Sequence, residues 1–341
     1  MSTFDGIYPE RQGLLARLFP PKPLSSRVPK LRGKVAIVTG SACGLSLETS
    51  RKLLSYGLSK LILTIPPNAD AEEVGDILQV EFPKANIEAW HLDMESYASV
   101  REFGHHADLL LDQLDIVILN DHMAPKHFDV LPGIGHEKGF QVNYFSTLLL
   151  GVLLLPLLKE RSSNGEPGRL TIVGPEYSSE TWGVPYKKGS LLDYIQAQSQ
   201  WHSPFRRYRN STSFTRRFAT EVAKSVSSDE VIINSVSPGP VKNTALLETC
   251  GSFRTAYYKL RLALIEEPLS VEASRIIDAV TVTGQGLNGK YLRCGRVYEF
   301  FSTDESWYFD TLLWEETMKE FSYVVGEKTM QNIGLPRKIS N

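Results

Sequence analysis

Short runs of valine, isoleucine and leucine alternate with longer helical segments along this chain, and this alternation restricts the fold more than any other feature. The runs that we interpret as strands lie at residues 34–40, 60–65, 86–93, 114–120, 168–174, 231–239 and 289–294. They are apolar almost throughout, which is typical of parallel strands that are covered on both faces. The sequence therefore predicts an α/β fold with one doubly wound parallel sheet of about seven strands and helices on both faces.

Helical patterns separate these runs, at residues 47–57, 71–82, 99–114, 139–155, 208–226 and 271–282. Strands that alternate with helices form βαβ units, the usual route to a parallel sheet. A further amphipathic segment at 306–325 either packs on the core or forms an oligomer seam. Residues 176–206 are longer than an ordinary connection, and we interpret them as a lid-like insertion.

The length of 341 residues is enough for two domains. Doubly wound sheets nevertheless form single domains of about 250 residues. We therefore predict one domain over residues 31–322, an irregular arm over 1–30 and a C-terminal tail over 323–341.

The charge balance excludes partners that require a basic surface. Lysine and arginine total 37, aspartate and glutamate total 39, and the net charge is -2. Such a balance provides no basic field for nucleic acid or anionic lipid. The predicted partner is a small-molecule substrate, with no nucleic acid.

Two further features bear on location and metal binding. The longest apolar run, residues 148–158, contains Pro156 and is shorter than the roughly 20 residues of a membrane-spanning helix, so it predicts a buried helix and no membrane partner. Cys43, Cys250 and Cys294 are far apart and lack metal-ligand spacing. They predict no metal, no disulfide framework and a cytoplasmic location.

A glycine-rich turn follows the first predicted strand, in the segment GKVAIVTGSACGLS at residues 33–46. A strand, such a turn and a helix receive the pyrophosphate of a dinucleotide, because the helix N-terminus offers free N–H groups and a positive dipole end. Thr39, Gly40 and Gly44 resemble the Thr-Gly-x-x-x-Gly-x-Gly fingerprint of the short-chain dehydrogenase/reductase family, with Ser46 at the third glycine. The resemblance covers most of the chain and is closest to fungal members associated with secondary metabolism, through WHLDMESYASV, GHEKGFQVNYFSTLLL, RYRNS and SVSPGPVKN.

This resemblance implies a Rossmann-like fold, NADP or NAD as cofactor, and roles for several residues near strand ends. By resemblance, Asp93 is the carboxylate near the adenine amino group, and Asn120 begins the strand end that the family forms as Asn-Ala-Gly. Asn143 matches the asparagine that holds a structural water near the catalytic lysine. Pro238 and Gly239 match the loop that lies along the nicotinamide.

Other cofactor-binding positions depart from the family pattern. Pro66 and Pro67 stand where the family often places a basic residue for the 2′-phosphate of NADP, so the preferred coenzyme is open. Asp121 and His122 replace the Ala-Gly that normally follows Asn120, and thus place an acid and an imidazole where the family has almost no side chains.

The catalytic positions depart further. The resemblance makes Tyr208 the proton-transferring tyrosine, but Thr212 stands at the lysine and Pro175 at the serine. A free phenol has a pKa of about 10, and the family's lysine lowers this value. Ser178 and Ser179 follow Pro175 and would serve only if their loop turned inward.

Three functions are compatible with this degenerate tetrad. The first is an NAD(P)(H)-dependent oxidoreductase acting on a small natural-product alcohol or carbonyl, with Tyr208 and Asn143 retained. The second is a non-redox isomerase, cyclase or dehydratase that uses Tyr208, Asp121 or His122 as acid or base. His122 suits such a redeployed role, since an imidazole titrates near pH 6.5. The alternative role for His122 is a loop histidine bonded to backbone. The third is a catalytically silent homologue. By analogy with the family, the apolar helix at 145–158 also suggests a homodimer.

Overall fold

The computed structural model describes residues 29–40, 44–174, 189–239, 268–281, 285–298 and 304–336. Most of the predicted N-terminal arm lies outside these residues. So do Pro175, Ser178 and Ser179 from the predicted catalytic region.

The described strands form one sheet in the order β3-β2-β1-β4-β5-β6-β7-β8. Their bounds are β1 Val35–Val38, β2 Lys60–Ile65, β3 Asn86–His91, β4 Ile116–Leu119, β5 Gly168–Val173, β6 Val231–Ser237, β7 Tyr291–Arg293 and β8 Arg296–Tyr298. Neighbouring strands from β3 to β7 are parallel, and β8 is antiparallel to β7. The predicted doubly wound parallel sheet is therefore confirmed, with β8 as an addition.

The turn between β7 and β8 explains this extra strand. Cys294 and Gly295 form a two-residue connection, and both have positive φ, 48° and 74°. Two such residues match the right-handed twist of a hairpin. All of β8 is exposed and it has no run of apolar residues, so it lacks the pattern that predicts the buried strands.

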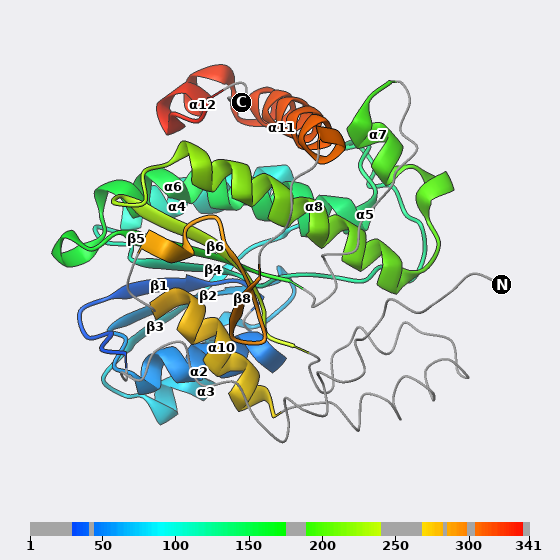
Figure 1. The fold of residues 1–341 in the computed structure, drawn as a ribbon. Helices are drawn as coiled ribbons and strands as arrows, with labels where there is room; N and C mark the ends of the chain where they lie inside the picture. The colour runs from blue at the N-terminus through cyan, green and yellow to red at the C-terminus, as the bar shows by residue number, and fades with distance from the viewer. Residues whose placement is uncertain are drawn as a thin grey trace.

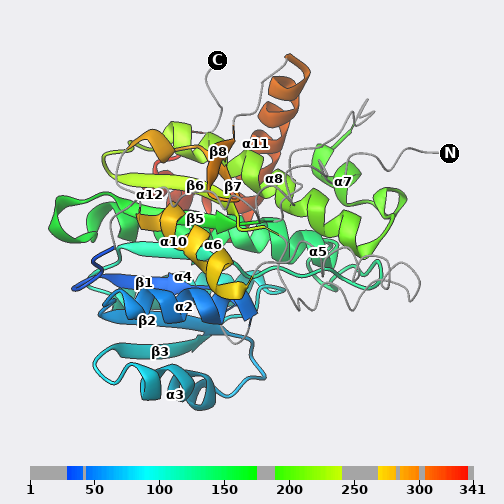
Figure 2. The same ribbon diagram turned by 60° about the horizontal axis from the view of Figure 1, so that its bottom comes forward.

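Helices cover both faces of the sheet (Figure 1). One face carries α4 (Tyr97–Leu110), α6 (Thr147–Glu160) and α8 (Pro204–Ser225), and the other carries α2 (Gly44–Ser55), α3 (Ala71–Glu81) and α10 (Leu269–Thr281). Figure 2 shows α2 and α10 side by side on their face. Each face has its own buried apolar cluster.

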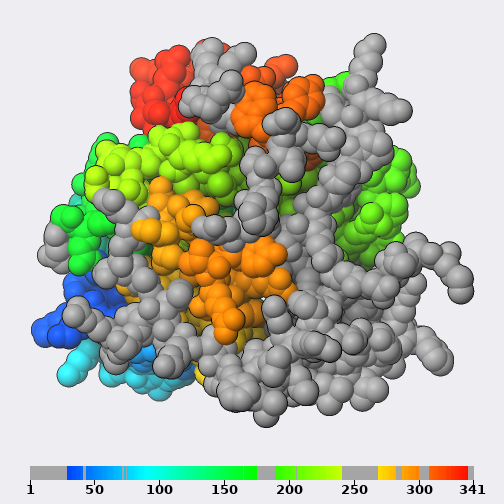
Figure 3. All heavy atoms as spheres, viewed as in Figure 1, coloured from blue at the N-terminus to red at the C-terminus, as the bar shows by residue number. Residues whose placement is uncertain are grey.

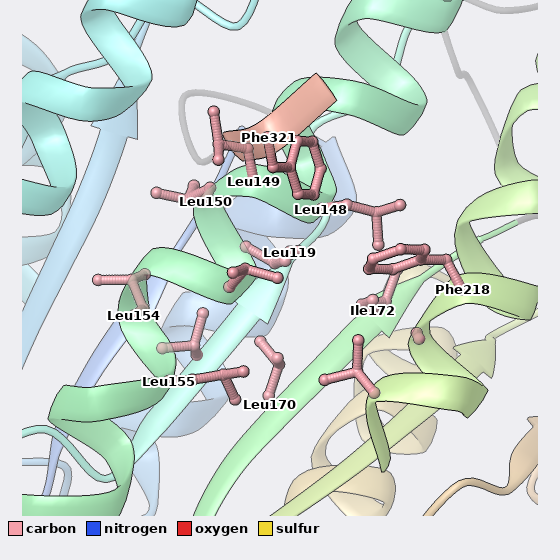
Figure 4. Close-up of a cluster of buried hydrophobic side chains, with 14 of the residues drawn as sticks. Leu119, Leu148, Leu149, Leu150, Leu154, Leu155, Leu170, Ile172, Phe218 and Phe321 are labelled. Carbon is pink, nitrogen blue, oxygen red and sulfur yellow. The ribbon is translucent and has the colours of Figure 1, made fainter. Parts of the chain in front are cut away.

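The predicted buried helix lies at the centre of the first cluster. Lys138–Glu160 is the one described helical segment that is long and apolar enough to cross a membrane, but 89% of its most apolar window is buried inside the protein. Its leucines, such as Leu148 and Leu155, pack in one cluster with Leu119 of β4, Leu170 of β5 and Phe218 of α8 (Figure 4). This segment is therefore a core helix, as predicted.

Two C-terminal helices, α11 (Asp304–Val325) and α12 (Glu327–Ile333), form an outer layer over α6 and α8 (Figure 1). Trp314 is fully buried and stacks on Phe218 of α8 at 4.7 Å between ring centroids. Of the two interpretations of residues 306–325, core packing is the one that this helix shows. Part of the predicted C-terminal tail is helical, because Met330 and Ile333 of α12 are buried in the same cluster.

Candidate active site

The predicted site residues gather at the carboxyl ends of the parallel strands. Gly40 lies just beyond β1, Asp93 beyond β3, Asn120 beyond β4 and Gly239 beyond β6. In an open parallel sheet, this edge forms the crevice in which ligands bind. The topology therefore brings together segments that are far apart in sequence.

Thr39 joins the ends of β1 and β4. Its buried Oγ1 accepts hydrogen bonds from the backbone N–H groups of Asn120 at 2.9 Å and Asp121 at 3.0 Å. Its own N–H donates to the carbonyl of Ile118 at 3.0 Å. These bonds hold the residues after β4 against the glycine-rich turn.

The two retained glycines have the backbone that the turn requires. Gly40 and Gly44 have φ values of +71° and +57°, a region that favours glycine. The N–H of Gly40 donates to Oγ1 of Thr64 at 3.0 Å. Gly44 begins α2, and a Cβ there would meet no described atom within 4 Å. No described side chain therefore covers Gly44 at the N-terminus of α2.

Ser46 takes the place of the third glycine without filling this space. It is 3% exposed, and its hydroxyl accepts a hydrogen bond from the side-chain amide of Asn120. The side chain of Ser46 thus points toward the end of β4, and its hydrogen bond with Asn120 links α2 to this strand. Together with the open approach at Gly44, this arrangement fits a dinucleotide, whose pyrophosphate Gly40, Gly44 and the N-terminus of α2 would hold.

The Pro238–Gly239 turn is anchored from α10. Nη1 of Arg275 donates to the carbonyl of Pro238 at 2.5 Å. Gly239 has φ +125°, and a Cβ there would lie 2.9 Å from the same Nη1. Only glycine therefore fits at this position. Sequence reasoning did not identify Arg275; the available signal is a cation, together with Glu272, among the buried positions of a largely apolar helix face.

Tyr208 lies near the start of α8, which Ser203 caps by accepting a hydrogen bond from the N–H of Arg206 at 3.2 Å. Tyr208 is 8% exposed. Burial, with a smaller contribution from Tyr291, raises the pKa of its phenol above the ordinary value. In the described part of the chain no group hydrogen-bonds to this phenol. The surroundings therefore make Tyr208 a weaker acid, opposite to the effect that a lysine would have.

Thr212 does not replace the missing lysine. Its side chain is buried, and Oγ1 donates to the carbonyl of Tyr208 at 2.8 Å, one turn earlier in α8. The hydroxyl therefore serves the helix backbone and brings no positive charge to the phenol.

Arg216 is the nearest buried cation farther along α8. Its guanidinium lies 5.8 Å from the ring centroid of Tyr291, and burial lowers its pKa to about 10, so it stays charged at neutral pH. Tyr291 belongs to β7, and Figure 3 shows residues 285–298 at the surface directly beneath α8. Sequence reasoning did not identify Tyr291, because it is one apolar residue of a short strand.

Asn143 lies in a π-helical segment, η1 (Gln141–Ser146), between α5 (Lys138–Phe140) and α6. Its side chain accepts from the N–H of Met123 at 2.8 Å, donates to the Met123 carbonyl at 2.8 Å and donates to Oγ of Ser211 at 2.9 Å. Its backbone carbonyl accepts from Oγ1 of Thr215 at 2.6 Å. Asn143 thus ties the segment after β4 to α8. Its role toward a structural water stays a prediction.

His122 is brought against Tyr208. The two rings meet edge to face, with centroids 6.1 Å apart. Burial lowers the pKa of His122 to about 4, so the imidazole is neutral at physiological pH. Its Nε2 is buried and has no hydrogen-bond partner among the described residues. The ring also has a hydrogen bond with the backbone of Asn120, which partly opposes the effect of burial on its pKa. A neutral imidazole with a free Nε2 beside a neutral phenol is equipped to accept or relay a proton.

Two carboxyl groups complete the crevice on the nucleotide side. Asp121 is half-buried, and burial together with the charge of Asp93 raises its pKa to about 6. Oδ1 of Asp93 accepts from the N–H of Glu95 at 2.9 Å, which holds the turn after β3.

A doubly wound sheet with a glycine turn between β1 and α2, and a tyrosine on the helix before β6, defines a protein of the dinucleotide-binding oxidoreductase type. The model of the short chain dehydrogenase family matches residues 34–174. The short chain dehydrogenase/reductase mfmJ of Annulohypoxylon moriforme is 33% identical over 86% of this chain and 86% of its own. The short chain dehydrogenase virL of Hypocrea virens is 33% identical over 94% of both chains.

The chain therefore belongs to the short-chain dehydrogenase/reductase family. Its fold is also similar to the solved structure of the RhlG/NADP active-site complex of Pseudomonas aeruginosa, with a TM-score of 0.59, 20% identity, and coverage of 77% of this chain and 95% of that chain. The similarity to fungal relatives confirms the resemblance predicted from the sequence motifs.

Proposed function

We propose that this protein is an NAD(P)(H)-dependent oxidoreductase that acts on a small natural-product alcohol or carbonyl in secondary metabolism. The observation that supports the proposal is the pair of described ends of the glycine-rich turn: Thr39 bonds to the segment after β4, and Gly40 and Gly44 have positive φ at the start of α2.

The bound cofactor would supply or accept the hydride. Tyr208 would exchange a proton with the substrate oxygen, and His122 would relay that proton through its unpartnered Nε2. Asn143 would keep the segment that carries His122 at a fixed distance from α8. Asp93, Asn120, Pro238 and Gly239 would line the cofactor side of the crevice.

A second candidate function is favoured by the His122–Tyr208 contact. Both groups are neutral at physiological pH, and neither Nε2 of His122 nor the phenol of Tyr208 has a hydrogen-bond partner within the described residues. Such a pair could shuttle a proton in an isomerisation, cyclisation or dehydration without any nucleotide. Product formation that continues after complete removal of nucleotide would establish this alternative.

The oxidoreductase proposal is tested by restoring the missing groups. We expect the double variant Pro175→Ser with Thr212→Lys to reduce a panel of ketones at least about tenfold faster than the parent with NADH or NADPH, because a lysine ammonium would lower the pKa of Tyr208. The double variant Pro175→Ser with Thr212→Met is the matched control, because methionine extends the side chain at position 212 but carries no positive charge. Equal rates in both double variants, with nucleotide bound, would contradict a merely weakened reductase.

Location and assembly are proposals as well. A cytoplasmic protein with a small-molecule substrate agrees with the buried core helix at 138–160. For a homodimer, α6 is a poor contact surface, since it already packs against α4, α8 and α12. A dimer would therefore form through a face of the protein other than α6. Light scattering of the purified protein measures whether a dimer exists.

A further inference from the structure

Asp121 lies directly on the glycine turn. A Cβ built on Gly40 would be 3.1 Å from Cα, 3.3 Å from Cβ and 3.5 Å from Cγ of Asp121. The N–H of Asp121 is held by Oγ1 of Thr39 at 3.0 Å, so its backbone is fixed relative to β1. The carboxyl group therefore stays next to the turn that would receive a pyrophosphate.

The described residues around this carboxyl group do not neutralise it. Within the described residues it has no hydrogen-bond donor and no ion-pair partner. Thr39 and Gly40 from β1, Thr64 from β2 and Ser46 from α2 bring no charge to this edge. The charged group that acts on Asp121 is another acid, Asp93 beyond β3, and its chain neighbour His122 is neutral.

The sequence after β2 offers no cation for an extra phosphate. Between Lys60 and Lys84 it contains no lysine or arginine, and Pro66 and Pro67 follow the strand. A dinucleotide that lies across this edge would bring its phosphates toward the carboxyl groups of Asp121 and Asp93, and like charges at short distance repel strongly in a partly buried site.

We propose that Asp121 sets the affinity and the pH dependence of dinucleotide binding, because it takes up a proton from solvent when the pyrophosphate binds. This inference rests on the proposed function. It also assigns the coenzyme: NAD(H), which lacks the additional 2′-phosphate, is favoured over NADP(H). Asp121 stands where the family pattern has the alanine of Asn-Ala-Gly, so this carboxyl group is a feature of the present chain and not of the family pattern.

The titration of Asp121 agrees with this role. Burial and the charge of Asp93 raise its pKa to about 6, so a proton is available close to neutral pH. An anion bound nearby raises a carboxyl pKa further. Affinity then increases as the pH falls, by up to about tenfold per pH unit between the pKa of the free protein and that of the complex.

Calorimetric titration of the full-length protein with NAD+ tests the proposal without any activity assay. Binding is measured between pH 5.5 and 8.5, and at pH 7 in two buffers with different ionisation enthalpies, which gives the number of protons taken up. The variants are Asp121→Asn and Asp121→Ala, with Asp112→Asn as the control at an exposed acid. NADP+ serves as the second probe.

We expect the parent protein and Asp112→Asn to take up close to one proton and to bind NAD+ more tightly at low pH. Both Asp121 variants should bind NAD+ about tenfold more tightly at pH 7.5, with no proton uptake and a flat pH profile. NADP+ should bind more weakly than NAD+ in the parent. Proton-free, pH-independent binding that is equal in all variants would overturn the role of Asp121 and leave the proposed function intact. If neither the parent nor the Asp121 variants bound nucleotide at any pH, both proposals would fail.

Discussion

The nucleotide end and the catalytic end of the crevice have each lost a residue that the family pattern contains, but with different consequences. At the nucleotide end, Ser46 replaces a glycine and forms a hydrogen bond with Asn120, which links the same two elements. At the catalytic end, Thr212 replaces a lysine and bonds only to the backbone of its own helix. The first change preserves a structural link, whereas the second removes a charge.

The difference follows from what each position contributes. The glycine turn acts mainly through backbone conformation and N–H groups, so a small side chain that points away from the ligand is tolerated. In the proposed reaction, proton transfer depends on the pKa of the Tyr208 phenol, and burial raises that pKa, which is the unfavourable direction for an acid. The two substitutions therefore predict that nucleotide binding persists while proton transfer is weakened.

The largest effect is expected from Tyr208→Phe. Removal of the phenolic O–H should lower turnover by about 10² to 10⁴, the usual contribution of general acid catalysis, while nucleotide affinity stays unchanged. The assay compares turnover with calorimetric binding. Tyr323→Phe is the control, because Tyr323 is 89% exposed. Unchanged turnover in Tyr208→Phe would exclude the tyrosine from the chemistry.

Asn143→Ala should cause the next largest effect, a loss of about 3 kcal/mol in the free energy of unfolding. The substitution removes bonds to Met123 and Ser211 and leaves partly buried backbone groups without partners. Urea denaturation measures the loss, with exposed Asn332→Ala as the control. If the free energy of unfolding fell by less than about 0.5 kcal/mol, Asn143 would not be a structural link between the segment after β4 and α8.

His122 should make the protein less stable in mild acid. Its pKa falls from 6.5 in the unfolded chain to about 4 in the folded protein, so its stabilising contribution is complete above pH 6.5. The contribution is lost progressively as the pH falls from 6.5 through about 4, and we expect the full loss to be about 3 kcal/mol. His122→Asn should remove this part of the pH dependence, and exposed His105→Asn should not. Identical pH profiles for both variants would argue against a buried neutral imidazole.

Most of the fold was predictable because apolar runs and helical periodicity are local features. The strand β8 was not, since its three exposed residues pair only through the turn at Cys294 and Gly295. The position of site residues at strand ends was also predictable, because carboxyl ends of parallel strands meet at one edge.

The contacts between those residues were not predictable. The approach of His122 to Tyr208 depends on how α8 packs against the segment after β4, and that packing involves the π-helical turn at Asn143. Hydrophobic periodicity does not reveal a π-helical turn. The bond between Ser46 and Asn120 has the same origin, since two distant segments supply its partners.

The smallest effect is expected at that bond. Ser46→Ala removes the acceptor for the Asn120 amide and should lower the free energy of unfolding by about 1 kcal/mol, the typical net value of one hydrogen bond. Ser46→Gly restores the family residue and should cost slightly more, because glycine also lowers helix stability. Both variants should bind NAD+ with nearly parental affinity, since the serine faces β4. A loss of nucleotide affinity in Ser46→Ala much larger than its loss of stability would show that the hydroxyl contacts the ligand, and the nucleotide end would then have changed its chemistry as the catalytic end has.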